Sequence, residues 1–289
     1  MIRLSNNKSK RHYKFIFLIL SSDKYPSYLN EKAQYKTWIS DLEDDSLAIF
    51  YKGGNKFEYI NNYLTLETGS SLGDIGYKTI ASFEWLKKHY TFDYIVRPSS
   101  STYINLKELK KHISENASSK PFYSGRSTIY DSTFEYAHGS CIMLDNTAVD
   151  IILKNQNSWD HTLIDDAALG KLCGLLDIKL IPKEVLHVDS KILKGELDKN
   201  EIAYRCKMEL SGYPRFLDRY FIQLVHDNLN DIYNKNTVLL YRIIFNLIKF
   251  FNLKYIYLQY NSKIYYKITS YFPSSFKNFI KKLLKTKSS

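Results

Sequence analysis

The stretch KFIFLILSSD, residues 14–23, predicts a buried β-strand near the start of the chain. Its six apolar residues, 15–20, follow one another without a charge and end at Ser21-Ser22-Asp23. Strands of a parallel sheet are covered on both faces and therefore form continuous apolar runs of this kind. The run is too short for the apolar core of a signal peptide and far too short to cross a membrane. We therefore interpret it as the first strand of an α/β sheet.

Strand and helix patterns alternate downstream of this strand. Such alternation is typical of βαβ units, so we expect an α/β fold with a mixed, mostly parallel, Rossmann-like sheet flanked by helices. Strands are predicted at residues 46–51, 93–97, 139–144 and 179–182, and helices at 31–41, 73–89, 105–116, 163–176, 215–232, 237–251 and 273–284. Residues 186–210 show no clear pattern.

The composition is that of a folded globular protein. The 289 residues are 44% hydrophobic and 25% charged, with 11 Gly and 6 Pro, which excludes the collagenous, disordered and low-complexity classes. Three cysteines, Cys141, Cys173 and Cys206, are too few for a disulfide scaffold and have no CxxC spacing. This usage indicates a reducing compartment and excludes zinc ribbons.

The positive net charge belongs to the C-terminal part of the chain. Eleven of the 41 basic residues follow Asp231, the last acidic residue, so residues 1–231 carry 30 basic and 30 acidic groups. The segment is also rich in Phe, Tyr, Ile and Leu, and an anionic membrane surface attracts basic apolar segments. We expect a catalytic body at 1–230 and a helical, aromatic-rich, membrane-associating appendage at 231–289. A nucleic-acid partner is the less favoured alternative, because no RNA- or DNA-binding motif accompanies the charge.

The carboxyl end of the strand at 93–97 carries the most informative motif, because ligands of open α/β sheets bind beyond such ends. The sequence there is RPSSSTYIN, and Tyr77-Lys78-Thr79 and Trp85 precede it on a predicted helix. This order resembles the fringe and β-1,3-galactosyltransferase group of GT-A glycosyltransferases. In that group a Lys-Thr helix with a Trp precedes a strand that ends in Asp-Asp-Asp, then Thr, an aromatic residue and Val-Asn. In this frame Ser99, Ser100 and Ser101 stand in the positions of the three aspartates.

Later segments continue the resemblance in the family's order, over residues 14–182 in all. They are Tyr123-Ser124-Gly125, then Ala137-His138-Gly139, then Asp165-Asp166 with Gly170 four residues further on. The resemblance implies a GT-A-like fold and a nucleotide-sugar donor. It gives no support to the basic appendage, which lies outside it.

The serines are also a departure from the family pattern, in which a carboxylate of the triple aspartate holds a divalent metal on the donor diphosphate. Hydroxyl groups are poor ligands for Mn²⁺ or Mg²⁺, so we expect no metal and no other cofactor. The charge of the leaving diphosphate then needs cationic side chains and hydrogen-bond donors. The candidate substrate-binding residues are Ser21, Lys78, Arg97, Ser99, Ser100, Ser101, His138, Gly139, Arg205 and Lys207, with Arg215 behind them.

An inverting transferase needs one carboxylate to take the proton of the attacking acceptor hydroxyl. By resemblance this general base is Asp166, with Asp165 as the alternative. A helix N-terminus lowers a carboxylate pKa and keeps the base ionised at neutral pH. The same pair is also what an ordinary helix start looks like.

The sequence therefore predicts an inverting, metal-independent hexosyl- or N-acetylhexosaminyltransferase. We expect a glycan or lipid-linked glycan acceptor of the bacterial capsule, lipooligosaccharide or O-antigen type. We expect the enzyme to lie peripherally on the cytoplasmic face of the membrane. Two alternatives stay open: a non-catalytic nucleotide-sugar or glycan binding protein on a degenerate transferase fold, and a basic-tailed nucleic-acid or membrane adaptor.

Overall fold

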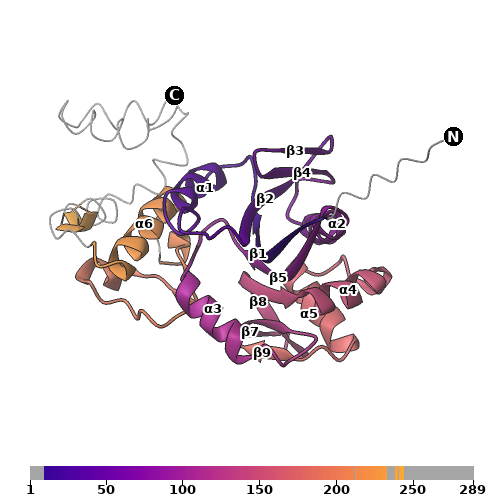
Figure 1. Cartoon of the computed structure of the whole chain (residues 1–289). Coiled ribbons are helices and arrows are strands. Elements are labelled where there is room, and N and C mark those ends of the chain that lie inside the picture. The colour runs from indigo at the N-terminus through magenta and orange to yellow at the C-terminus, as the bar shows by residue number, and fades with distance from the viewer. Residues whose placement is uncertain (1–9, 212, 233–237, 240, 244–289) are drawn as a thin grey trace. The chain divides into compact units, whose positions relative to one another are not determined.

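The computed structural model describes residues 10–211, 213–232, 238–239 and 241–243 (Figure 1). The chain divides into two compact units, Met1–Lys207 with Phe216–Tyr233 and Met208–Arg215 with Asn234–Ser289. The named β-strands and α-helices below all belong to the first unit. The predicted membrane-associating appendage at 231–289 lies almost entirely outside the described residues. Of its predicted helix at 237–251, residues 238–239 and 241–243 are described and are helical.

A large mixed sheet forms the centre of the first unit. Within the described residues its strand order is β3-β4-β2-β1-β5-β8-β7-β9. Neighbours pair in parallel from β4 through β2 and β1 to β5 and again between β7 and β9, whereas β3-β4, β5-β8 and β8-β7 are antiparallel. The strands are β1 (Arg11–Leu20), β2 (Ser46–Gly54), β3 (Glu58–Ile60), β4 (Tyr63–Glu67), β5 (Tyr90–Pro98), β7 (Tyr123–Tyr130), β8 (Phe134–Asp145) and β9 (Leu180–Pro182). The predicted α/β architecture is confirmed.

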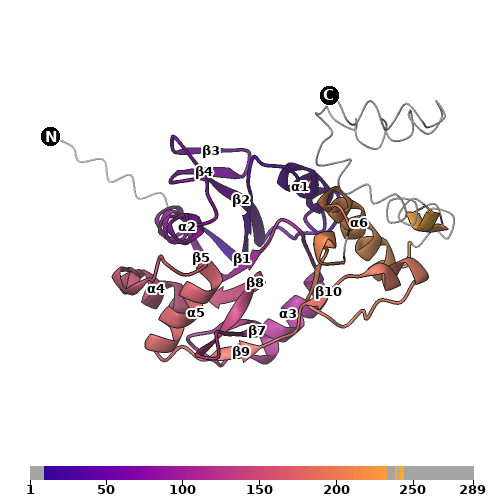
Figure 2. The same ribbon diagram turned by 180° about the vertical axis from the view of Figure 1, so that it is seen from behind.

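The central strand β1 is buried on both faces, which explains its continuous apolar run. Ile16 and Leu18 belong to a core cluster that also holds side chains of α2, α4 and α5. The alternate residue Phe17 packs against Trp38 on the opposite face. The helices are α1 (Ser27–Tyr35), α2 (Ile75–His89), α3 (Leu106–Glu115), α4 (Asn146–Lys154), α5 (Asp165–Leu175) and α6 (Asp218–Leu229). Figures 1 and 2 show α2, α4 and α5 grouped on one side of the sheet.

Several element boundaries differ from the predictions. The helix expected at 31–41 begins earlier, after Pro26, and ends at Tyr35 as α1. Thr37 explains the early end, because its hydroxyl donates to the carbonyl of Ala33 at 2.8 Å, a local bond that competes with helix continuation. Helix α6 is shorter than the predicted 215–232. Among the described residues, seven further elements were not predicted: β3, β4, β6, β7, β10, β11 and α4.

A second, small sheet has the order β10-β11-β6. It consists of β10 (Leu186–His187), β11 (Ala203–Arg205) and β6 (Thr102–Ile104), and Arg205 is in register with Thr102. Residues 186–210, which carried no clear sequence pattern, thus bring Arg205 to the segment that follows β5.

Candidate active site

The three serines lie where the carboxyl ends of β1 and β5 meet β8. An isolated parallel bridge joins Leu20 to Ser99, and the Ser99 amide donates to the Ser140 carbonyl at 3.1 Å. The Ser99 hydroxyl lies 2.9 Å from the Thr102 hydroxyl and 3.3 Å from that of Ser101. The hydroxyls of Ser99, Ser101 and Thr102 therefore form a connected network at the sheet edge.

The carboxylate of Asp166 faces β8 from the first turn of α5. Its Oδ2 accepts a hydrogen bond from the Gly139 amide at 2.6 Å, and its Oδ1 accepts one from the amide of the next residue, Ala167, at 3.1 Å. A Cβ on Gly139 would come within 2.9 Å of Oδ2, so a larger residue there would displace the carboxylate. Gly139 thus holds the predicted base in place.

Asp165 forms a buried ion pair with Arg97, which is 2% exposed. The Nε of Arg97 also donates to the Tyr51 hydroxyl at 2.6 Å, and that hydroxyl lies 3.2 Å from the hydroxyl of Thr79 on α2. Burial acts to lower the pKa of Arg97, but Asp165 and Tyr51 outweigh it and raise that pKa. Burial raises the pKa of Asp165, against the opposing charge of Arg97. The Arg97 guanidinium is therefore engaged inside the protein.

The serines and the acidic pair are connected through residues that adjoin them in the chain. One link runs along β5, where Arg97, which pairs with Asp165, precedes Ser99 by two residues. The other link runs along β8, where Gly139 donates to Asp166 and the next residue, Ser140, accepts the Ser99 amide. Segments more than sixty residues apart in the sequence thus meet at one place.

His138 and the cations around it form a third part of this region. Arg205 approaches His138 with its guanidinium NH1 2.9 Å from Nε2, and Nδ1 lies 3.0 Å from the Ser140 hydroxyl. Arginine only donates, so Nε2 accepts from Arg205, and the Ser140 amide donates to Nδ1 at 3.1 Å, so both ring nitrogens face N–H donors. Burial, followed by the charges of Arg205, Arg126 and Lys207, lowers the pKa of His138 to about 4. We name Arg126, Arg205 and Lys207 the basic cluster. Arg126 was missed in the sequence, because its strand, β7, was not predicted.

The remaining predicted residues have separate surroundings. The Ser21 hydroxyl donates to the carboxylate of Glu31 and is buried. Lys78 is also buried, and its Nζ donates to the Ser71 carbonyl at 3.1 Å. Burial lowers the pKa of Lys78, opposed by the charges of Asp74 and Asp165. Ser100 is half-buried. Arg215 belongs to the second compact unit.

The donor groups of the site do not fit a divalent metal. Ser99 and Ser101 offer hydroxyls that bond to one another, and Asp165 is paired with Arg97, which leaves a single carboxylate, that of Asp166, in this group. Divalent cations of this type require several available carboxylate or carbonyl oxygens. Among the described residues, no group of three or more His, Cys, Asp or Glu side chains is arranged to hold a metal ion.

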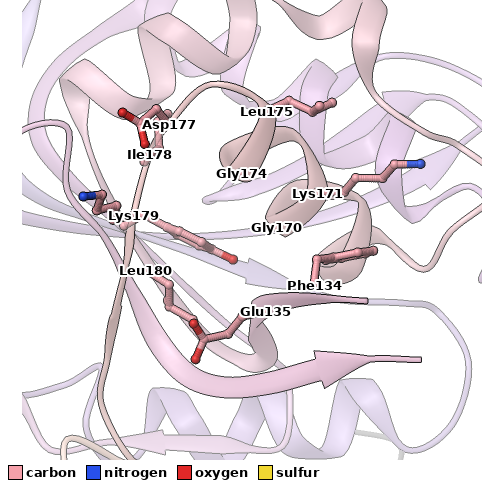
Figure 3. A pocket seen from close by; sticks show the side chains of 11 residues that line it. Phe134, Glu135, Gly170, Lys171, Gly174, Leu175, Asp177, Ile178, Lys179 and Leu180 are labelled. Carbon is pink, nitrogen blue, oxygen red and sulfur yellow. The ribbon is translucent and has the colours of Figure 1, made fainter. Parts of the chain in front are cut away.

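A cavity of about 590 Å³ lies at the other end of α5 (Figure 3). Gly170 and Gly174 form its helical wall, and Phe134 and Lys179 lie across from them. A Cβ on Gly170 would lie 2.2 Å from the Cβ of Tyr136, whereas a Cβ on Gly174 would meet nothing within 4 Å. The cavity includes none of the predicted site residues.

Comparison with known proteins gives distant structural neighbours only. No protein-family model matches the sequence, and a search among curated proteins found no match. A glycosyltransferase involved in the glycosylation of the major capsid of PBCV-1 has 9% identity and a TM-score of 0.45, covering 72% of this chain and 98% of that one. Mouse xyloside xylosyltransferase 1 has 8% identity and a TM-score of 0.38, covering 67% and 97%. The galactosyltransferase LgtC, in complex with donor and acceptor sugar analogues, has 8% identity and a TM-score of 0.38, covering 73% and 95%.

Likeness at these TM-scores carries no conclusion about activity. The plain result is the fold class, a mixed α/β sheet flanked by helices, which the strand pairing itself defines. Among the described residues, no helix combines the length and apolar character needed to cross a membrane.

Proposed function

We propose that the chain is an inverting glycosyltransferase that moves a sugar from a nucleotide-sugar donor to a hydroxyl of a glycan acceptor. The observation that carries the proposal is the meeting of Asp165-Asp166, Ser99–Ser101 and the basic cluster at the carboxyl edge of β1 and β5. Ligands of open α/β sheets bind at such edges. An acidic pair beside a group of cations suits a reaction in which a hydroxyl loses a proton and a diphosphate leaves.

Asp166 is the proposed general base. The acceptor oxygen attacks the anomeric carbon, its proton passes to the carboxylate, and the bond from that carbon to the diphosphate oxygen breaks. Each Asp166 oxygen accepts one backbone amide and has a further lone pair, so an acceptor hydroxyl can still donate to it.

The basic cluster is the proposed counterpart of the leaving diphosphate. Arg126, Arg205 and Lys207 lie close enough to His138 to lower its pKa together, so their charges act on one small region. Cationic side chains supply the stabilisation that a metal would otherwise give, and guanidinium groups bind phosphate oxygens in pairs. The transfer we propose therefore needs no divalent metal.

Arg97 has a different proposed role from the one predicted from the sequence. Its guanidinium is paired with Asp165 and Tyr51, so we assign it to positioning the acidic pair and leave diphosphate binding to the basic cluster.

Donor binding tests the proposal. The full chain is screened by thermal shift against UDP-, GDP- and CMP-sugars, each with Mn²⁺ and with EDTA. We expect at least one donor to raise the melting temperature equally in both conditions. A protein that no donor stabilises would contradict the proposal, and stabilisation only with Mn²⁺ would contradict its metal-free form.

A non-catalytic sugar-binding protein is the second candidate, and the absence of the family's aspartates at residues 99–101 favours it. It predicts donor binding without turnover. If the wild type releases sugar or nucleotide from the bound donor and Asp166→Asn does not, this candidate is excluded.

The acceptor and location also remain proposals. A glycan of the bacterial capsule, lipooligosaccharide or O-antigen type, linked to a lipid, suits a catalytic body joined to a basic, aromatic-rich segment. In this proposal the enzyme works at the cytoplasmic face of the membrane. The donor could be a hexosyl or an N-acetylhexosaminyl nucleotide.

A further inference from the structure

Tyr77, in the first turn of α2, presents an exposed aromatic ring that is held flat. The ring packs face to face on His161, with centroids 3.6 Å apart and planes 3° from parallel. Half of Tyr77 is exposed, at 50%. Because His161 covers one face, the exposed part is the other face and the edge. We name this pair the Tyr77 platform.

The packing beneath the Tyr77 platform fixes the ring. A Cβ on Gly76 would lie 2.7 Å from Trp159 Nε1 and 3.2 Å from His161 Nδ1, so glycine lets the loop before α5 approach α2. Trp159 is buried at 5% exposure. Within the described part of the chain, the Tyr77 hydroxyl has no hydrogen-bond partner. The Tyr77 ring is thus held by packing and not by a hydrogen bond of its hydroxyl.

The Tyr77 platform lies beside the acidic pair. His161 precedes Asp165 by four residues, and Lys78, the neighbour of Tyr77, is near enough to Asp165 for its pKa to respond to that charge. Helices α2 and α5 lie side by side (Figures 1 and 2). Two other exposed apolar side chains, Leu72 at 86% and Ile164 at 59%, stand just before these two helices.

The basic cluster adjoins the acidic pair through β8, and the Tyr77 platform adjoins it through α2. The charges of the basic cluster act on His138, and the next residue, Gly139, donates a hydrogen bond to Asp166. On α2, Lys78, which follows Tyr77, lies near Asp165. In a displacement with inversion, the attacking hydroxyl and the leaving diphosphate stand on opposite sides of the anomeric carbon. If the diphosphate lies at the basic cluster, the acceptor therefore enters from the α2 side.

We infer that the Tyr77 platform binds the acceptor by stacking on the apolar C–H face of a pyranose ring. A pyranose has one face of C–H groups and an edge of hydroxyls, and a rigid exposed aromatic ring buries such a face at little cost in side-chain entropy. The inference rests on the proposed function and names the substrate that Tyr77 selects, a glycan that offers a pyranose to the acidic pair.

A glycan array probed with the full chain tests the inference. The wild type should bind a subset of the immobilised glycans, Tyr77→Phe should bind the same subset, and Tyr77→Ala should bind at least tenfold more weakly. The matched control is Phe57→Ala, since Phe57 is equally exposed at 51% and lies in the segment before β3. It should bind like the wild type. Wild-type binding to no glycan, or undiminished binding by Tyr77→Ala, would overturn the inference.

Thermal shift with nucleotide sugars separates this inference from the proposed function. Donors should stabilise Tyr77→Ala as much as the wild type, because the ring belongs to the acceptor side. Loss of the donor shift in Tyr77→Ala would overturn the inference by placing the donor on the ring. A wild type that no donor stabilises would instead contradict the proposed function, whatever the array shows.

Discussion

The buried ion pair between Arg97 and Asp165 is the strongest electrostatic feature at the scale of single residues. Both side chains are largely shielded from water, at 2% and 11% exposure. A buried pair is not itself a large source of stability, but removal of one partner leaves a charge without compensation in the interior. The acidic pair of the candidate site therefore depends on Arg97 for its charge state.

We predict that Arg97→Met lowers the free energy of unfolding by about 3–5 kcal/mol at pH 7, measured by urea denaturation. Without Arg97 the pKa of Asp165 in the folded state rises further, so folding takes up a proton. The difference in free energy of unfolding between the wild type and Arg97→Met should therefore shrink as the pH falls toward the pKa of an aspartate in the unfolded chain. The control is Lys110→Met, which removes the half-buried partner of the exposed Glu43 and should cost less than about 1 kcal/mol. Equal losses in the two variants would contradict this account.

His138 gives a pH-dependent prediction. Its pKa in the folded protein is about 4, below the ordinary value, so the unfolded chain binds more protons between about pH 6.5 and pH 4. This contribution to stability is complete above pH 6.5 and is lost as the pH falls through that window. After allowance for partial solvent access it amounts to at most about 2 kcal/mol.

Denaturant titrations of the wild type and His138→Gln measure this contribution. The stability of the wild type relative to the variant should fall between pH 6.5 and pH 4. A constant difference across that range would show that the ring is not held neutral.

Residue identity could be predicted where the chemistry is local. The sequence pointed to Asp165-Asp166, Ser99–Ser101 and Arg205, which the structure brings together. It did not reveal that Arg97 faces Asp165, because that contact joins residues 68 apart and no local pattern encodes it.

Helix α5 connects the acidic pair to the core at the scale of elements. Asp166, Gly170 and Gly174 are four residues apart and share one helix face. Gly139 contacts Asp166, Tyr136 contacts Gly170, and Gly174 lines the cavity of Figure 3. Close packing at Gly170 therefore fixes the distance at which Asp166 meets β8.

The two glycines should respond oppositely to alanine. Gly174→Ala should raise the free energy of unfolding by about 0.5–1 kcal/mol, because the added methyl meets open space and the helix loses a glycine. Gly170→Ala should lower it by about 1–3 kcal/mol, because the methyl would overlap Tyr136. Calorimetry of the two variants measures both effects. A stabilised Gly170→Ala would show that α5 is not packed against β8 as described.

Elements with a strong hydrophobic period were predicted, and those held by pairing were not. The apolar run at 15–20 and the amphipathic helix at 73–89 correspond to β1 and α2. Strand β7 has the polar sequence YSGRSTIY and is held by pairing with β8 and β9, which no local pattern shows. The hairpin of β7 and β8 also makes part of the sheet antiparallel.

The charge distribution gives a prediction at the scale of the whole molecule. Because all eleven basic residues after Asp231 lack acidic counterparts, we expect the full chain to bind vesicles that contain phosphatidylserine and to leave neutral vesicles unbound. Replacement of Lys281, Lys282, Lys285 and Lys287 by Gln should weaken binding by up to about a thousandfold, since each charge near an anionic surface contributes about 1 kcal/mol. Vesicle flotation at two salt concentrations measures this. Salt-sensitive binding to RNA without binding to vesicles would contradict it.

Turnover of the donor by Asp166→Asn in EDTA tests the central claim most directly. The donor that stabilises the wild type is incubated with each protein, and release of the nucleoside diphosphate is followed with and without a glycan acceptor. We predict turnover by the wild type in EDTA and a loss of at least a hundredfold in Asp166→Asn, the usual contribution of a general base. A wild type that is inactive until Mn²⁺ is added, or an Asp166→Asn enzyme as active as the wild type, would contradict the account.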